Sequence, residues 1–188
     1  MNGYFPRATA AACVAVLSVI PSLVAQERYL RAEENKNHDL VITTSAGGQV
    51  VVPKSDRKWA DQAQLEFRSI AVSRDGSAVG WVAYYSNCCT SYPVPILLEV
   101  YKAGNRRTLD PAIAPWHWCF VDGTDRIAAI STTVHGPQHQ LIELWDVSTG
   151  RRRELFTWMD GESYPDAPTW VVAVRGSRAA NIHDCSTK

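Results

Sequence analysis

The amino-acid sequence predicts an all-β protein whose repeating unit is a four-stranded antiparallel meander. Its composition is that of an ordinary globular domain, because 46% of its 188 residues are hydrophobic and 20% are charged. An internal repeat is present, with 47 residues between Gly76 and Gly123 and 46 between Gly104 and Gly150. Within each copy, short β-branched and aromatic runs alternate with turns that contain glycine, and neither copy contains a convincing helix.

Each copy of the repeat divides into four strands because turn residues separate its apolar runs. Asp75-Gly76 and Gly104-Asn105 mark turns in the first copy, and Asp122-Gly123 and Thr149-Gly150 mark the matching turns in the second. A longer polar loop joins the second and third strands of each copy. The predicted strands are 70–73, 78–85, 96–102 and 106–109 in the first copy, and 118–121, 126–132, 141–147 and 152–155 in the second.

Incomplete copies of the repeat flank the two full ones. Two apolar runs, 40–44 and 49–52, surround a Ser-Ala-Gly-Gly turn and predict a hairpin that forms the outer half of a preceding copy. After the second copy, 169–174 predicts the first strand of a further one. The polar segments 26–37 and 54–64 are compatible with short helices.

The N-terminal segment has the layout of a secretory signal peptide. Arg7 precedes an apolar run that Pro21 breaks, and Ala25 precedes polar residues. An uncleaved membrane anchor is the alternative, but the run is rich in alanine, whereas a span needs about 20 strongly apolar residues. We therefore expect a bacterial protein that is periplasmic or secreted and has no membrane span after cleavage. The expected regions are a signal peptide at 1–25, a propeller-like β domain at 26–176 and a flexible tail at 177–188.

The turns of the two copies resemble those of known propeller repeats. Residues 72–76, Val-Ser-Arg-Asp-Gly, resemble the Ser-Pro-Asp-Gly element of TolB-type periplasmic propeller repeats, with arginine in place of the proline. Residues 144–150, Leu-Trp-Asp-Val-Ser-Thr-Gly, are similar to the blade ending of WD40 repeats. The resemblance covers roughly residues 67–156. The loops 87–95 and 134–139 are also similar to those of a group of uncharacterised bacterial exported proteins.

This resemblance implies that the meanders are propeller blades. A closed propeller needs at least four blades of about 40 residues each, which is nearly all of the chain after residue 25. We therefore expect a small or partial β-propeller, with a β-sandwich built from the same meanders as the alternative. An open array leaves strand edges exposed, so the protein is expected to be a monomer or to self-associate through an open edge.

Strand parity, the alternation in direction of successive strands, places the chemically distinctive loops on one face of the protein. In a four-stranded meander, the second-to-third loop and the connection to the next blade emerge at the same end, which brings together 87–95, 111–117, 134–139 and 159–168. Aromatic side chains in such loops suit a recognition surface. We expect a non-catalytic binding module for a protein or small-molecule ligand, without a cofactor, and the formal charge of zero argues against nucleic acid. The candidate ligand-binding residues are Tyr92, Trp116, His117, His135, His139, Trp158 and Tyr164.

Four cysteines follow the predicted signal peptide, and this even number predicts disulfides in an oxidising compartment. Cys88 and Cys89 end one strand at the loop face, and Cys119 begins a strand at the same level. We therefore expect one of the two to pair with Cys119 and the remaining thiol to pair with Cys185. A vicinal bond between Cys88 and Cys89 is a rarer alternative.

A metal-dependent or thiol-dependent enzyme on the same face is the alternative function. Imidazole and thiolate groups bind zinc or copper, so the weak metal-site alternative comprises His117, Cys119, His135 and His139. A thiol enzyme would use Cys89, with His135 or His117 as the base that activates it. Bonded cysteines favour the binding module, whereas free thiols and bound metal favour the enzyme.

Overall fold

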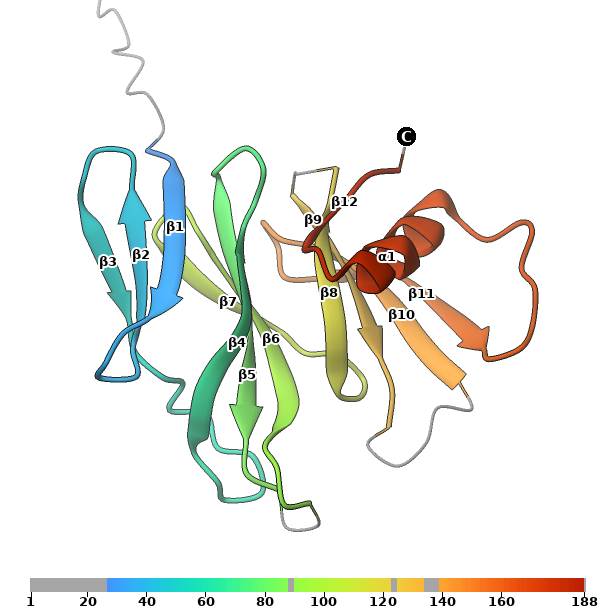
Figure 1. The fold of residues 1–188 in the computed structure, drawn as a ribbon, viewed down its shortest axis with the longest axis horizontal. Coiled ribbons are helices and arrows are strands. Elements are labelled where there is room, and N and C mark those ends of the chain that lie inside the picture. Colours follow the sequence, from blue (N-terminus) through green and yellow to red (C-terminus); the bar gives the residue numbers. More distant parts are fainter. Residues whose placement is uncertain (1–26, 88–89, 123–124, 134–138, 188) are drawn as a thin grey trace, which may run out of the picture.

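The computed structural model describes residues 27–87, 90–122, 125–133 and 139–187. Strands make up 52% of the described residues and helix 8%, which confirms the all-β class. The strands form three open sheets, which follow one another along the molecule (Figure 1) and pack face to face. We call them the N-terminal, middle and C-terminal sheets.

The N-terminal sheet contains β1 (Tyr29–Glu34), β2 (Leu40–Thr44) and β3 (Gln49–Val52), all antiparallel. Strands β2 and β3 confirm the predicted hairpin, and β1 is a strand in a segment that the sequence left compatible with a short helix. Leu40 and Ile42 are fully buried because the alternating side chains of β2 point toward the middle sheet.

The middle sheet is the first full copy of the repeat. It contains β4 (Gln64–Val72), β5 (Ala78–Tyr85), β6 (Val94–Lys102) and β7 (Asn105–Leu109), which pair antiparallel in sequence order. Every residue of β5 is buried, because other sheets or connections cover both faces of this strand. The four-stranded meander predicted for this copy is confirmed.

The C-terminal sheet is the second full copy with one added strand. Strands β8 (Pro115–Val121), β9 (Arg126–Ser131), β10 (His139–Asp146) and β11 (Arg152–Met159) form the predicted antiparallel meander. The short β12 (Asp184–Cys185) pairs parallel with β8, so the strand order is β11-β10-β9-β8-β12.

The middle sheet packs between the other two. Phe67 and Trp81 face the N-terminal sheet, whereas Val82 and Leu98 share an apolar cluster with Trp118 of the C-terminal sheet. This face-to-face packing is compatible with the sandwich-like alternative, and none of the described sheets closes on itself.

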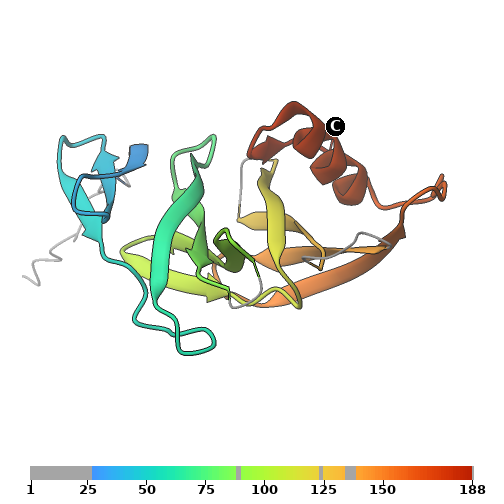
Figure 2. The same ribbon diagram turned by 60° about the horizontal axis from the view of Figure 1, so that its bottom comes forward.

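A helix covers the face of the C-terminal sheet that points away from the middle sheet (Figure 2). This helix is α1 (Thr169–Ala180), so the strand predicted at 169–174 is wrong. Its buried residues Trp170, Val171 and Val174 follow helical spacing and pack on β8, β9 and β12. No helix in the described part of the chain is long and apolar enough to cross a membrane.

The C-terminal residues are part of the fold, which corrects the expected separate tail at 177–188. The boundary at 176 falls within α1, and β12 then returns to the edge of the C-terminal sheet. Cys185 forms a disulfide with Cys119 of β8, with 5.8 Å between their Cα atoms. Cys119 therefore does not pair with Cys88 or Cys89, because α1 carries the chain back to β8 and places Cys185 beside it.

Candidate functional site

A cavity of about 680 Å³ lies at the end of the middle sheet where β5 ends and β6 begins. Tyr85, Ile96 and Leu97 supply an apolar base. The walls come from the 53–63 connection, which reaches the same end of the molecule as the loop after β5 (Figure 1), and from the 110–114 connection between β7 and β8. A concave, mostly apolar cavity of this size is typical of small-molecule sites.

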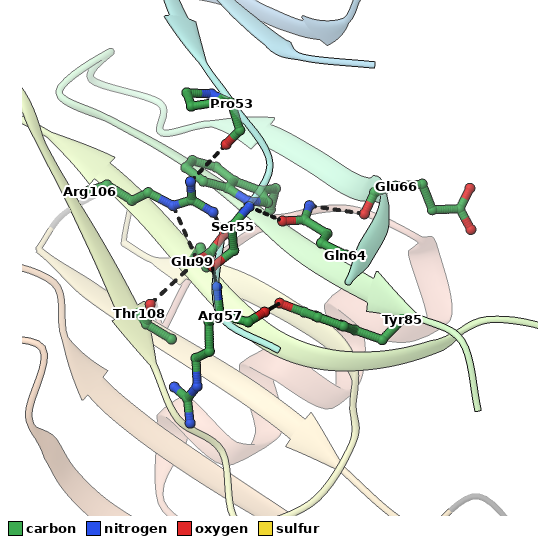
Figure 3. Close-up of polar contacts among 10 residues, drawn as sticks. Pro53, Ser55, Arg57, Gln64, Glu66, Tyr85, Glu99, Arg106 and Thr108 are labelled. Carbon is green, nitrogen blue, oxygen red and sulfur yellow. Dashed lines mark hydrogen bonds and ion pairs between the residues drawn. The ribbon is translucent and has the colours of Figure 1, made fainter. Parts of the chain in front are cut away.

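Hydrogen bonds hold the 53–63 connection against the sheet (Figure 3). The Tyr85 hydroxyl donates to the main-chain oxygen of Arg57 at 2.9 Å, and the Ser55 main-chain nitrogen donates to Gln64 Oε1 at 2.7 Å. Burial raises the pKa of Tyr85, which keeps its hydroxyl protonated as a donor. This wall of the cavity is therefore fixed by the strands beneath it.

A buried carboxylate anchors the same connection more deeply (Figure 3). Glu99 of β6 is 0% exposed and accepts hydrogen bonds from Trp81 Nε1 at 2.8 Å, Arg106 Nη2 at 2.6 Å and Thr108 Oγ1 at 3.4 Å. Arg106 Nη1 in turn donates to the main-chain oxygen of Pro53 at 2.8 Å. One ion pair thus ties β5, β6 and β7 to the start of the connection.

The second copy of the repeat uses an equivalent carboxylate for the opposite wall. Glu143 of β10 is also 0% exposed and, like Glu99, pairs with an arginine of the following strand, here Arg152 at 2.8 Å. Its other oxygen accepts a hydrogen bond from the Ala112 main-chain nitrogen at 3.3 Å. The sequence reasoning missed both residues. The available signal was one glutamate in the apolar third strand of each copy, followed by arginine in the fourth.

A tight turn holds an aromatic side chain at the cavity. Trp59 and Gln62 exchange two main-chain hydrogen bonds, of 3.0 and 2.9 Å, across Ala60 and Asp61. Both central residues are left-handed, with φ of 45° and 63°, a conformation that is costly outside glycine. The turn packs the Trp59 side chain against the cluster that contains Tyr85.

The rim of the cavity carries charge. The Arg57 guanidinium pairs with Asp110 at 3.1 Å, which joins the two walls across the opening, and both side chains are at least half exposed. Lys58 also lines the cavity and is exposed, and it has no ion-pair partner among the described residues.

The cavity brings together parts of the loop face that strand parity predicted. Asn87 and Val94 come from the 87–95 loop, Pro111 to Ala114 come from the 111–117 loop, and Thr132 lies shortly before the 134–139 loop. The candidate Trp116 lies next to the cavity, because its Nε1 donates to the main-chain oxygen of Thr132 at 3.3 Å.

Two other candidates are not part of the cavity, and a third lies outside the described residues. Tyr92 is 49% exposed and is not among the cavity's lining residues. His139 lies at the start of β10, opposite Met159 of the edge strand β11 of the C-terminal sheet. His135 lies outside the described residues.

His117 is buried under α1 and away from the cavity. Its Nε2 lies 2.9 Å from Ser177 Oγ, which itself donates to the main-chain oxygen of Val174. The ring stacks on His183, with 5.4 Å between centroids. Burial and the neighbouring His183 lower the pKa of His117 to about 4, so the imidazole is neutral and holds the helix to β8.

Trp158 and Tyr164 form a separate aromatic cluster at the outer edge of the C-terminal sheet. Their ring centroids are 4.6 Å apart, and the Arg175 guanidinium of α1 lies 3.8 Å from the centre of the Trp158 ring. The Tyr164 hydroxyl donates to Glu162 at 2.6 Å. These contacts join β11, the following loop and α1 to one another.

The proposed metal set is not assembled in the described residues. Cys119 is bonded to Cys185, and His117 faces Ser177. No group of three or more potential metal ligands occurs in the described ranges. Cys88 and Cys89, which the thiol alternative needs, lie outside those ranges.

Comparisons of the chain with protein-family models, with curated proteins and with solved structures found no match.

Proposed function

We propose that this chain is a non-catalytic binding module that holds a small, predominantly apolar molecule in the cavity between the 53–63 and 110–114 connections. The observation that carries the proposal is the cavity itself, which has a volume of about 680 Å³ and a base of Tyr85, Ile96 and Leu97. Binding of an apolar group there removes both ligand and cavity surface from water, which is the main driving force at such sites.

The anchoring of the walls supports a preformed site. Glu99 acts through Arg106 on one connection, and Glu143 holds the Ala112 amide of the other. A site whose walls are held before the ligand arrives loses less conformational entropy on binding, which favours affinity. The contacts of His117 with Ser177 and of Cys119 with Cys185 are better explained as supports for α1 than as parts of a reactive site.

The wider architecture and location are part of the same proposal. The three stacked sheets are interpreted as blades of a partial propeller, because the two full copies are four-stranded meanders packed face to face. The N-terminal apolar segment and the buried disulfide support an exported protein, periplasmic or secreted.

Titration with the neutral fluorescent probe Nile red tests the binding site. Ala112 lines the cavity and is exposed, so Ala112→Trp fills the opening with little effect on the core. Ala180, exposed at the end of α1, provides the matched control Ala180→Trp. We expect saturable binding of one probe per chain to the wild type and the control, and at least tenfold weaker binding to Ala112→Trp. Absence of saturable binding, or equal binding by all three proteins, would overturn the proposal.

A further inference from the structure

The rim of the cavity holds an excess of positive charge directly beside its apolar base. Among the described residues that line it, the charged ones are Arg57, Lys58 and Asp110, two cations and one carboxylate. Because Asp110 already pairs with Arg57, the Lys58 ammonium carries the excess charge of the rim. A ligand bound against Tyr85 and Leu97 would extend toward these side chains.

The main chain fixes the position of Lys58. On one side, the carbonyl oxygen of Arg57 accepts the Tyr85 hydroxyl, and on the other, the main chain of Trp59 is held by two hydrogen bonds with Gln62. The residue between these anchors cannot move away from the rim without breaking one of them. The ammonium group can still adjust, because its four-carbon stem is flexible.

We infer that the ligand of this cavity is an amphipathic organic acid, a molecule with an apolar body and one carboxylate, and that Lys58 recognises the carboxylate. The inference rests on the proposed function. A single net positive charge matches a monoanion, whereas a phosphate ester with close to two negative charges would remain only partly neutralised. The apolar base excludes a ligand that is polar throughout, because burying its polar groups without partners is unfavourable.

Asp110 sets the strength of this charge. Its carboxylate neutralises Arg57 and repels an incoming anion, so Asp110→Asn leaves a rim with two unopposed cations. Lys58→Gln has the opposite effect and leaves a neutral rim. The two variants should therefore change the preference for an anionic ligand in opposite directions, which a purely structural role of either residue would not produce.

Displacement of Nile red by decanoate and by decan-1-ol tests the inference. The two ligands have the same chain length and differ in charge at one end. In dilute buffer of low salt, we expect wild-type protein to prefer decanoate about fivefold over decan-1-ol, Lys58→Gln to lose this preference, and Asp110→Asn to increase it. Lys36→Gln, at an exposed position between β1 and β2, removes the same charge elsewhere and should behave as wild type.

The possible outcomes separate the two proposals. Equal affinity of the wild type for decanoate and decan-1-ol, or an undiminished preference in Lys58→Gln, would overturn the carboxylate assignment and leave the apolar site intact. An equal loss of preference in Lys36→Gln would also overturn it, since the effect would then come from net charge. Failure of both ligands to displace Nile red from a cavity that Ala112→Trp blocks would likewise reject an aliphatic acid, whereas absence of saturable Nile red binding rejects the proposed function itself.

Discussion

Removal of the Cys119–Cys185 disulfide should lower the free energy of unfolding by about 4 kcal/mol. The bond closes a loop of 66 residues, and the chain-entropy model gives about 4 kcal/mol for a loop of this length. Because domains of this kind are stable by only about 5–15 kcal/mol, the loss is a large part of the total. The effect should concentrate on α1 and β12, which the bond holds against β8.

Urea unfolding of Cys119→Ala/Cys185→Ala, followed by tryptophan fluorescence, measures this loss. Replacing both residues avoids leaving one buried thiol without its partner. Cys88→Ala/Cys89→Ala is the matched control, since it replaces the same number of cysteines and leaves the 119–185 bond in place. A loss below about 1 kcal/mol in the first variant would refute the reasoning, and so would an equal loss in the control.

Three further predictions concern the packing and the polar anchors. Gly80→Ala places a Cβ 2.5 Å from the Trp118 ring between two sheets, so we expect a loss of about 1–3 kcal/mol in urea unfolding, partly restored by adding Trp118→Phe; unchanged stability would contradict the close packing. Stability should fall by about 3 kcal/mol as pH decreases from 6.5 to 4, because unfolded histidine binds a proton that His117, with its pKa of about 4, does not bind in the folded protein. In His117→Gln the free energy of unfolding should depend less on pH over this range, and an unchanged pH dependence would contradict the low pKa of His117. Glu143→Leu removes the acceptor of the Ala112 amide, so the hydrogen of this amide should exchange faster with solvent. The free energy of unfolding should fall by about 1–3 kcal/mol, and Nile red should bind more weakly. Unchanged exchange would show that another group holds this wall.

The strands of the two full copies and the β2–β3 hairpin could be predicted from the sequence, whereas β1, β12 and the helix could not. Residues 169–174 are apolar and partly β-branched, and six residues are too few to distinguish a buried strand from one face of a helix. The buried face of the helix consists of Trp170, Val171, Val174 and Ser177, and the last of these lies in the predicted tail 177–188. The predicted pairing of Cys119 with Cys88 or Cys89 is wrong for the same reason, because only the return of the chain through α1 brings Cys185 to β8.

The cavity was predictable in part. Strand parity indicated which loops meet, but the 53–63 connection was not included. Its position depends on hydrogen bonds to Tyr85 and Arg106, which are far away in the sequence, as well as to Gln64 at the start of β4. The buried glutamates were accessible to sequence reasoning. Aligning the two copies places Glu99 and Glu143 in the same strand, and a charged residue in an apolar strand is unfavourable unless it is paired.

The two ends of the sheet array give a physical reason why it can remain open. At one end, α1 covers the outer face of the C-terminal sheet. At the other, the N-terminal sheet carries Arg31 paired with Glu33 beside Thr43, and Leu30 and Val51 are the exposed apolar residues of its strands. Repeat arrays need such polar or covered ends, because an exposed apolar face would bind a further repeat. The cavity lies between these two ends of the array, where Glu99 of the middle sheet and Glu143 of the C-terminal sheet hold its walls.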